Sequence, residues 1–314
     1  MTAARLIRSA PLALGLGLLA ACGGSSGSSS AKSDPPATTT TARAAATTAQ
    51  AQQPSCQAGG LHTVEGGLLR MPSGAQPGRT PLLLVVIPGG RGDPSDRLGV
   101  GRPANRQGVA ILYPTSPGST FWQLNDKFGT SDVTAVTGLI QRQLATGCFD
   151  PDRVSITGVS NGAGFTARMG CKLPTTFAAV MPVAAGYRAL DPCPPNARAS
   201  FLDIHGTADT VVPINGKKPD RKGNVARFTT RVARRVGCNT RPRRTTPQRL
   251  VTHFTYTGCP VGIRVERYAL TGTQHGWPGS RSGPRGRPPS ANPSGFKATD
   301  EVLRFIATAR RVGG

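Results

Sequence analysis

A pentapeptide near the middle of the chain constrains its fold more than any other feature. Gly158-Val159-Ser160-Asn161-Gly162 has the pattern G-x-S-x-G, with a β-type run before it (residues 153–157) and residues that can open a helix after it. The two glycines let a strand and a helix pack closely around a strained turn, so that the Ser160 hydroxyl projects from the top of a sheet. The pentapeptide alone is only moderately specific, because glycine and serine are common in this chain. How strongly the pentapeptide indicates such a turn therefore depends on the surrounding strands, helices and polar partners.

The remaining sequence supplies that context, because apolar strand-like runs alternate with helical patterns. The strand-like runs are residues 82–87, 109–113, 153–157, 178–184, 201–204, 250–256 and 263–270. The helical patterns are residues 131–145, 161–169, 225–236 and 299–310. In residues 131–145 the apolar positions recur every three or four residues, and Ser131 can cap that helix. The alternation predicts a mostly parallel central sheet with helices on both faces. Residues 278–293, rich in Pro, Gly and Arg, are expected to form a long surface loop.

The beginning of the chain has the pattern of an export signal. Residues 1–21 carry two arginines and then an apolar run too short to span a bilayer, which is typical of a signal peptide. Leu19-Ala20-Ala21-Cys22 resembles a bacterial lipobox, in which the cysteine is lipidated and anchors the protein to the membrane. An ordinary secretory signal followed by a chance cysteine is the alternative. Residues 22–54 are rich in Ser, Thr and Ala and predict a tether, and residues 55–314 are expected to form one catalytic domain.

Six further cysteines remain after Cys22, an even number that predicts disulfides in an exported chain. Six cysteines allow many pairings, of which we favour Cys171–Cys193 and Cys238–Cys259, leaving Cys56–Cys148 by elimination. We expect no metal site, because the chain has no C-x-x-C pair and its four histidines are scattered.

The chain carries a formal net charge of +23, contributed mostly by arginine and concentrated after Lys217. One interpretation is attraction to an anionic surface such as wall polymers or acidic lipid head groups. The other, which the sequence favours, is a solvated arginine-rich composition without a specific partner. We expect no nucleic-acid partner, because the chain is exported and has no recognised nucleic-acid-binding motif.

A serine nucleophile needs a base, and the base needs a carboxylate to orient it. His275 combines a position after a strand-like run with the chain order serine, carboxylate, histidine. Asp209 follows the run at 201–204 and fits the middle place. Asp203 and His205 are expected to be structural, with His205 holding the loop that presents Asp209.

Two backbone N–H groups must stabilise the oxyanion of the intermediate. Asn161, the residue after the nucleophile, is expected to supply one, and Gly90 in the loop after the first strong strand the other. Pro88 in that loop has no N–H group. Trp122 and Trp277 are weak candidates for substrate contact, with core packing as the alternative for both.

Four motifs together resemble a known family. They are Gly158-Val159-Ser160-Asn161-Gly162, Cys171-Lys172-Leu173-Pro174 with Phe177-Ala178-Ala179, Ile204-His205-Gly206-Thr207-Ala208-Asp209, and His275-Gly276-Trp277-Pro278-Gly279. They are similar to the extracellular polyhydroxybutyrate depolymerase, feruloyl esterase and acetylxylan esterase group, including actinobacterial esterase-like lipoproteins, over nearly all of residues 55–314. The resemblance implies an α/β-hydrolase fold, a Ser160–Asp209–His275 triad, no metal or cofactor, and ester hydrolysis through an acyl-enzyme.

The chain departs from the family pattern at two places. Pro88-Gly89 stands where the family often has His-Gly, and Gln274 and Gly276 flank His275 where the family usually has Gly and Thr. Neither change removes a catalytic group, but both bear on substrate preference.

The leading hypothesis is a secreted, membrane-tethered, monomeric serine esterase that acts on polyhydroxybutyrate-type oligomers, feruloyl esters or acetyl esters. One alternative is an acyltransferase that acts on a cell-wall glycan, since such enzymes share the triad but exclude water from the acyl-enzyme. Another is a non-catalytic surface-binding lipoprotein that uses its arginine-rich face.

Overall fold

The computed structural model describes residues 56, 59–73, 82–90, 96, 98–118, 121–216, 223–281 and 288–312. The expected signal peptide, the lipidation site at Cys22 and the tether all lie outside the described residues. The compact unit of the chain begins at Gln52 and runs to Gly314. Within the described residues, no helix is long and apolar enough to span a bilayer.

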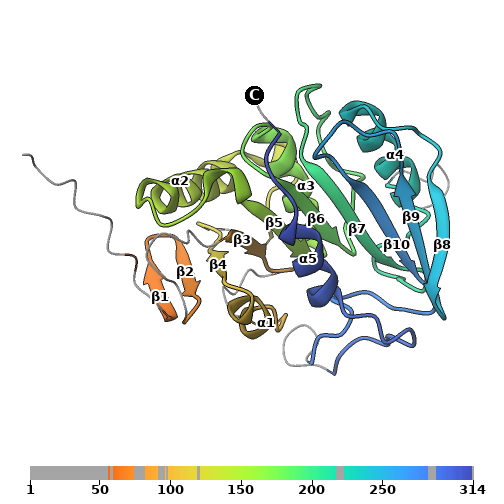
Figure 1. The fold of residues 1–314 in the computed structure, drawn as a ribbon, viewed down its shortest axis with the longest axis horizontal. Helices are drawn as coiled ribbons and strands as arrows, with labels where there is room; N and C mark the ends of the chain where they lie inside the picture. Colours follow the sequence, from red (N-terminus) through yellow and green to blue (C-terminus); the bar gives the residue numbers. More distant parts are fainter. Residues whose placement is uncertain are drawn as a thin grey trace, which may run out of the picture. The chain divides into compact units, whose positions relative to one another are not determined.

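Ten strands of the described chain form one sheet, with the order β1-β2-β4-β3-β5-β6-β7-β10-β9-β8 (Figure 1). The strands are β1 (Gly60–Val64), β2 (Gly67–Met71), β3 (Leu82–Ile87), β4 (Val109–Pro114), β5 (Ser155–Val159), β6 (Ala179–Val183), β7 (Ser200–Gly206), β8 (Arg243–Gln248), β9 (Val251–Tyr256) and β10 (Val265–Leu270). The six strands from β4 to β10 in that order pair in parallel, and the outer pairs on both sides are antiparallel. The expected α/β fold with a mostly parallel sheet is confirmed.

Helices cover both faces of this sheet. They are α1 (Gly101–Arg106), α2 (Ser131–Ala145), α3 (Asn161–Lys172), α4 (Val225–Val236) and α5 (Ala298–Ala307), with short 3-10 turns at Asp126–Phe128 and Pro151–Arg153. Apolar residues of α2, α3 and α4 belong to one buried cluster, and those of α1 and α5 belong to the cluster on the opposite face. Because both faces are covered, every residue of β4, β5, β6 and β7 is buried, and most of these residues are apolar.

The N-cap of helix α2 lies one residue earlier than we expected. Thr130, not Ser131, is the N-cap residue of α2, and its side chain makes no capping hydrogen bond. Ser131 instead accepts a hydrogen bond from Gln123. Asp132 in the first turn is buried and accepts hydrogen bonds from Ser116 Oγ and the Gln123 N–H, so it ties the preceding loop to the helix.

Three disulfides fasten the outer parts of the fold, in agreement with the even number of cysteines. Cys56–Cys148 joins the start of the described chain to the residues after α2, across a sequence separation of 92. Cys171–Cys193 ties the end of α3 to the loop before β7, and Cys238–Cys259 ties the end of α4 to the residues after β9. Each bond restrains a segment outside the parallel centre of the sheet.

Candidate active site

Ser160 occupies a strained turn between β5 and α3. Its backbone angles are φ 59° and ψ −124°, a region that residues other than glycine rarely adopt. The strain is held by backbone hydrogen bonds on both sides, since the Ser160 N–H donates to Val183 O and its carbonyl accepts from the Gly164 N–H. The local sequence therefore forms a strand, a sharp turn and a helix, as the G-x-S-x-G pattern predicts.

The glycines of the pentapeptide are needed because the loop after β3 packs directly on the turn. A Cβ atom on Gly162 would lie 2.2 Å from Pro88 O and 2.6 Å from Ile87 O. A Cβ atom on Gly158 would lie 2.7 Å from Ile87 O. These distances are too short for non-bonded atoms, so only glycine lets β3, β5 and α3 approach this closely.

The structure brings Ser160, His275 and Asp209 together in one hydrogen-bonded row. His275 Nε2 lies 2.8 Å from Ser160 Oγ, and His275 Nδ1 lies 2.7 Å from Asp209 Oδ2. The three residues follow β5, β10 and β7, which are parallel strands, so their carboxyl ends meet at the same edge of the sheet. Since a carboxylate can only accept, the proton of the neutral imidazole lies on Nδ1, which leaves Nε2 free to accept from the serine hydroxyl.

The Asp209 side chain is buried and receives several donors. Its Oδ1 accepts hydrogen bonds from the backbone N–H groups of Val211 and Val212, and its Oδ2 accepts from His275. Burial alone would raise the pKa of Asp209, but the hydrogen bonds from His205, His275 and the Val212 N–H outweigh it and hold this pKa well below its usual range. Asp209 is therefore ionised at neutral pH.

His205 supports the Asp209 loop from beneath. It is fully buried, and its Nε2 lies 2.8 Å from Val212 O and 3.4 Å from Asp209 Oδ2. Because a carbonyl oxygen can only accept, Nε2 must carry the proton. On the same strand, Asp203 is buried and accepts a hydrogen bond from Tyr187 OH. Burial of Tyr187 and the neighbouring Asp203 carboxylate raise the pKa of Tyr187, so its hydroxyl stays protonated. Both residues lie among buried groups and do not reach Ser160.

The loop that carries His275 is fixed by residues that the sequence did not reveal. Ser290 Oγ donates a hydrogen bond to the His275 carbonyl, and the Gln274 N–H donates to Ala291 O. Gly276 has φ +148°, and a Cβ atom there would lie 2.9 Å from Ser290 Oγ. The glycine at this position is therefore matched to the close approach of residues 290–291, which lie in a Pro- and Ser-rich stretch without a recognisable motif.

The two segments expected to supply N–H groups flank Ser160. Asn161 is the first residue of α3, where a backbone N–H has no acceptor within the helix. Across the turn, a Cβ atom on Gly89 would lie 3.3 Å from Ser160 Cβ, so the loop after β3 passes next to the nucleophile. Gly90 has φ +63° and faces open space.

Both tryptophans are buried and make the internal contacts that the core-packing alternative predicts. Trp122 is 2% exposed, stacks on Phe165 with ring centroids 4.8 Å apart, and donates from Nε1 to Pro88 O. Its backbone exchanges hydrogen bonds with the Asn161 side chain, so it braces both segments around Ser160. Trp277 is 6% exposed and donates to Thr299 on α5. The packing of either ring could not be predicted, because loop position alone does not indicate which way an indole ring points, and substrate contact stays a prediction.

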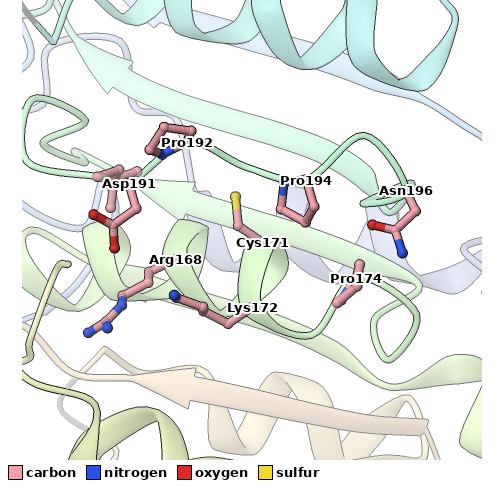
Figure 2. A pocket seen from close by; sticks show the side chains of 9 residues that line it. Arg168, Cys171, Lys172, Pro174, Asp191, Pro192, Pro194 and Asn196 are labelled. Atoms are coloured by element: carbon pink, nitrogen blue, oxygen red, sulfur yellow. The ribbon is translucent and has the colours of Figure 1, made fainter. Parts of the chain in front are cut away.

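A separate pocket of about 370 Å³ lies at the far end of α3 and includes none of Ser160, His275 and Asp209. Figure 2 shows Arg168, Cys171 and Lys172 of the helix facing the loop of Asp191, Pro192 and Pro194. Arg168 and Lys172 both pair with Asp126, at 2.7 and 2.6 Å. These charges are already paired within the protein, so we assign the pocket a structural role only. Among the described residues, no group of three His, Cys, Asp or Glu side chains could hold a metal ion.

Comparison with known proteins agrees with this geometry. Residues 67–187 match the family described as Esterase PHB depolymerase. A poly(3-hydroxyoctanoate) depolymerase from Pseudomonas fluorescens is 30% identical over 121 residues, which cover 34% of this chain and 44% of the relative, so the chain spans less than half of that protein.

Solved structures with low sequence identity share the fold. Acetyl xylan esterase from Aspergillus awamori has a TM-score of 0.55 and 17% identity, covering 80% of this chain and 100% of its own. A thermostable esterase has a TM-score of 0.51 and 18% identity, covering 78% of this chain and 59% of its own. Residues 67–187, which include the Ser160 turn, are thus similar to the Esterase PHB depolymerase family, and the chain has an α/β-hydrolase fold.

Proposed function

We propose that the protein is a serine carboxylester hydrolase with Ser160 as the nucleophile, His275 as the general base and Asp209 as the group that orients His275. The observation that carries the proposal is the continuous row from Ser160 Oγ through both nitrogens of His275 to Asp209, with contacts of 2.8 and 2.7 Å. Each contact lies within hydrogen-bond reach, as proton transfer requires.

In the proposed reaction, Ser160 Oγ attacks the ester carbonyl carbon while His275 Nε2 takes the hydroxyl proton. The ionised Asp209 stabilises the resulting imidazolium through its bond to Nδ1. When the tetrahedral intermediate collapses, the carbon–oxygen bond to the alcohol breaks and His275 returns the proton to the leaving oxygen. Water then attacks the acyl-enzyme by the same route and releases the acid.

The oxyanion of the intermediate would be stabilised by the backbone N–H groups of Asn161 and Gly90. The open end of the α3 helix supports Asn161, because the first N–H groups of a helix carry partial positive charge. The passage of Gly89 beside Ser160 supports the second donor. Pro88 contributes no N–H, but its carbonyl is held by Trp122 Nε1, which keeps this loop against the turn.

We further propose a hydroxyalkanoate oligomer, an acetyl ester or a feruloyl ester as the substrate class, with no metal or cofactor. The family match and the names of the similar proteins support ester chemistry. The exposed apolar side chain of Val211, two residues after Asp209, would suit the apolar part of an ester.

The export signal, the lipobox and the three disulfides support an extracellular protein anchored at Cys22. We expect it to act as a monomer.

The test combines covalent labelling with turnover. The wild type should react with a fluorophosphonate reagent at Ser160 and hydrolyse short p-nitrophenyl esters or methyl ferulate. Ser160→Ala should lower kcat by about four to six orders of magnitude while the melting temperature stays unchanged.

The outcomes separate the competing functions. Labelling of Ser160 without hydrolysis would favour acyl transfer to a specific acceptor. Absence of labelling in a folded protein would indicate a non-catalytic binding role. Equal turnover by Ser160→Ala would refute the assignment of the nucleophile.

A further inference from the structure

Helix α4 and strand β8 carry arginines that face away from the core. Arg227, Arg231 and Arg234 are exposed and recur at helical spacing along α4. The opposite side of the helix is buried, through Val225, Thr229, Val232, Ala233 and Val236. Arg241 and Arg244, in and before β8, are also exposed. We call these five residues (Arg227, Arg231, Arg234, Arg241 and Arg244) the α4–β8 arginine face.

The strand register places Arg244 on the side of the sheet that α4 covers. Arg244 pairs with Phe254, which pairs with Arg267, which pairs with Asp203. Directly paired residues project from the same face of a sheet. Asp203 projects on the same side as Phe201, two residues away, whose ring contacts Phe228 of α4. The short connection from α4 to β8 is also fixed by Cys238–Cys259, so these two successive elements are held on the same side of the sheet.

Within the part of the chain that the structure describes, no carboxylate forms an ion pair with the five arginines of this face. Residues 223–260 contain arginine but no Asp or Glu. Among the described residues, the carboxylates in ion pairs lie elsewhere and pair with other cations, as in Arg304–Glu301 and Arg311–Asp152. Like charges at helical spacing oppose helix formation. A solvated composition would mix both signs, whereas this surface presents one sign over two neighbouring elements and therefore attracts an anionic partner.

We propose that the α4–β8 arginine face binds the anionic phospholipid head groups of the membrane to which the protein is tethered. Guanidinium groups match phosphate with paired hydrogen bonds. The inference rests on the lipid anchor proposed for Cys22. An anchor at Cys22 would keep the protein at the bilayer surface. The bilayer is thus the anionic surface at the highest local concentration, and a basic face adds the second signal that strengthens acyl anchoring.

This orientation leaves the candidate active site accessible. Ser160, Asp209 and His275 lie at the carboxyl ends of β5, β7 and β10, whereas the arginine stripe of α4 points away from the sheet on its flank. A protein held by this flank would present the edge that carries Ser160 to substrates diffusing along the membrane.

The experiment measures vesicle binding by residues 52–314, the compact unit of the chain, which carry neither the apolar signal segment nor the lipid. Vesicles contain phosphatidylcholine with about 30 mol% phosphatidylglycerol, or phosphatidylcholine alone. The face variant replaces Arg227, Arg231, Arg234, Arg241 and Arg244 with Gln. A control variant of identical net charge replaces Arg102, Arg106, Arg188, Arg198 and Arg281, which are exposed elsewhere. The melting temperature of each variant checks the fold.

The parent protein should bind the anionic vesicles, dissociate from them at about 0.5 M salt, and show no binding to the neutral vesicles. The face variant should lose about tenfold or more in partition coefficient, and the control variant less than about threefold. Equal losses in both variants, no binding by the parent, or binding only to a soluble polyanion would overturn the proposal. Binding is measured without substrate, so this result would still hold if Ser160 proved not to be the nucleophile.

Discussion

The two sides of the candidate active site are held by different kinds of force. On the nucleophile side, Ser160 is fixed by the backbone, because glycines at 158 and 162 let three elements meet at distances that no larger residue permits. On the other side, Asp209 and His275 sit on longer loops that are fixed by hydrogen bonds from His205 and Ser290. The family match covers the first side and ends at residue 187, before either of the other two residues.

The difference indicates how each side tolerates change. A steric constraint is either satisfied or broken, so a substitution on the nucleophile side should either leave the activity unchanged or abolish most of it. A hydrogen-bonded loop loses its geometry by degrees, so substitutions beneath Asp209 and His275 should give graded losses.

Gly162→Ala should have the largest effect of the substitutions outside the triad. The added Cβ would lie 2.2 Å from Pro88 O, so the turn and the loop after β3 must separate. We expect kcat/KM to fall by about three orders of magnitude or the protein to lose stability. The matched control is Gly138→Ala on α2, where a Cβ meets only the flexible end of Arg142. Full activity in Gly162→Ala would contradict a sterically fixed elbow.

His205→Ala should give the largest graded loss on the other side. It removes the donor that holds Val212 O and thereby loosens the turn that presents Asp209. We expect kcat to fall about 100-fold with little change in KM. His205→Gln retains a donor near Nε2 and should recover most of the activity. If Ala and Gln lose equally, the hydrogen bond to Val212 O is not what positions Asp209.

Ser290→Ala should have a smaller effect, because it removes one hydrogen bond to the carbonyl of His275 and leaves the side-chain contacts of His275 in place. A loss of about tenfold in kcat, with an unchanged melting temperature, is expected. The exposed Ser73→Ala serves as the control. An unaltered kcat would mean that the Gln274–Ala291 hydrogen bond alone fixes the loop.

The smallest effect concerns stability in acid. Because the pKa of Asp209 is lower in the folded protein than in the unfolded chain, the unfolded chain binds more protons below about pH 4. The contribution of Asp209 to stability is therefore complete above that pH and disappears as the pH falls toward the folded-state pKa. Urea unfolding from pH 6 downward should show a steeper decline for the wild type than for Asp209→Asn. Parallel curves would exclude this coupling.

Much of the fold could be predicted because the central strands are buried on both faces. The runs at 82–87 and 109–113 correspond closely to β3 and β4, and the helix at 225–236 has the predicted bounds. Several outer elements could not be predicted. Strand β8 is Arg-rich and largely exposed, so it has no apolar alternation, and it is a strand only because β9 supplies hydrogen bonds. The hairpin of β1 and β2 and the short helix α1 are too brief to show a period.

The candidate site divides in the same way. Ser160, Asp209 and His275 could be selected from residue type and chain order, and they lie in contact. Ser290 could not be found, because its contact with His275 depends on the path of a loop. The packing of the tryptophans could not be predicted either, because the orientation of a side chain is a tertiary property: Trp122 turns inward to Phe165 and Pro88.

The Cys56–Cys148 bond has a mechanical consequence. Any pull on the chain that precedes Cys56 passes through this bond directly to the start of β5, since residues 57–147 form a closed covalent loop outside the path of the force. The terminal hairpin of β1 and β2 is part of that closed loop, so tension from the N-terminus cannot separate its strands from the sheet one hydrogen bond at a time. A domain held by its N-terminus against flow or wall movement would thus transmit strain to β5, a buried strand at the centre of the sheet.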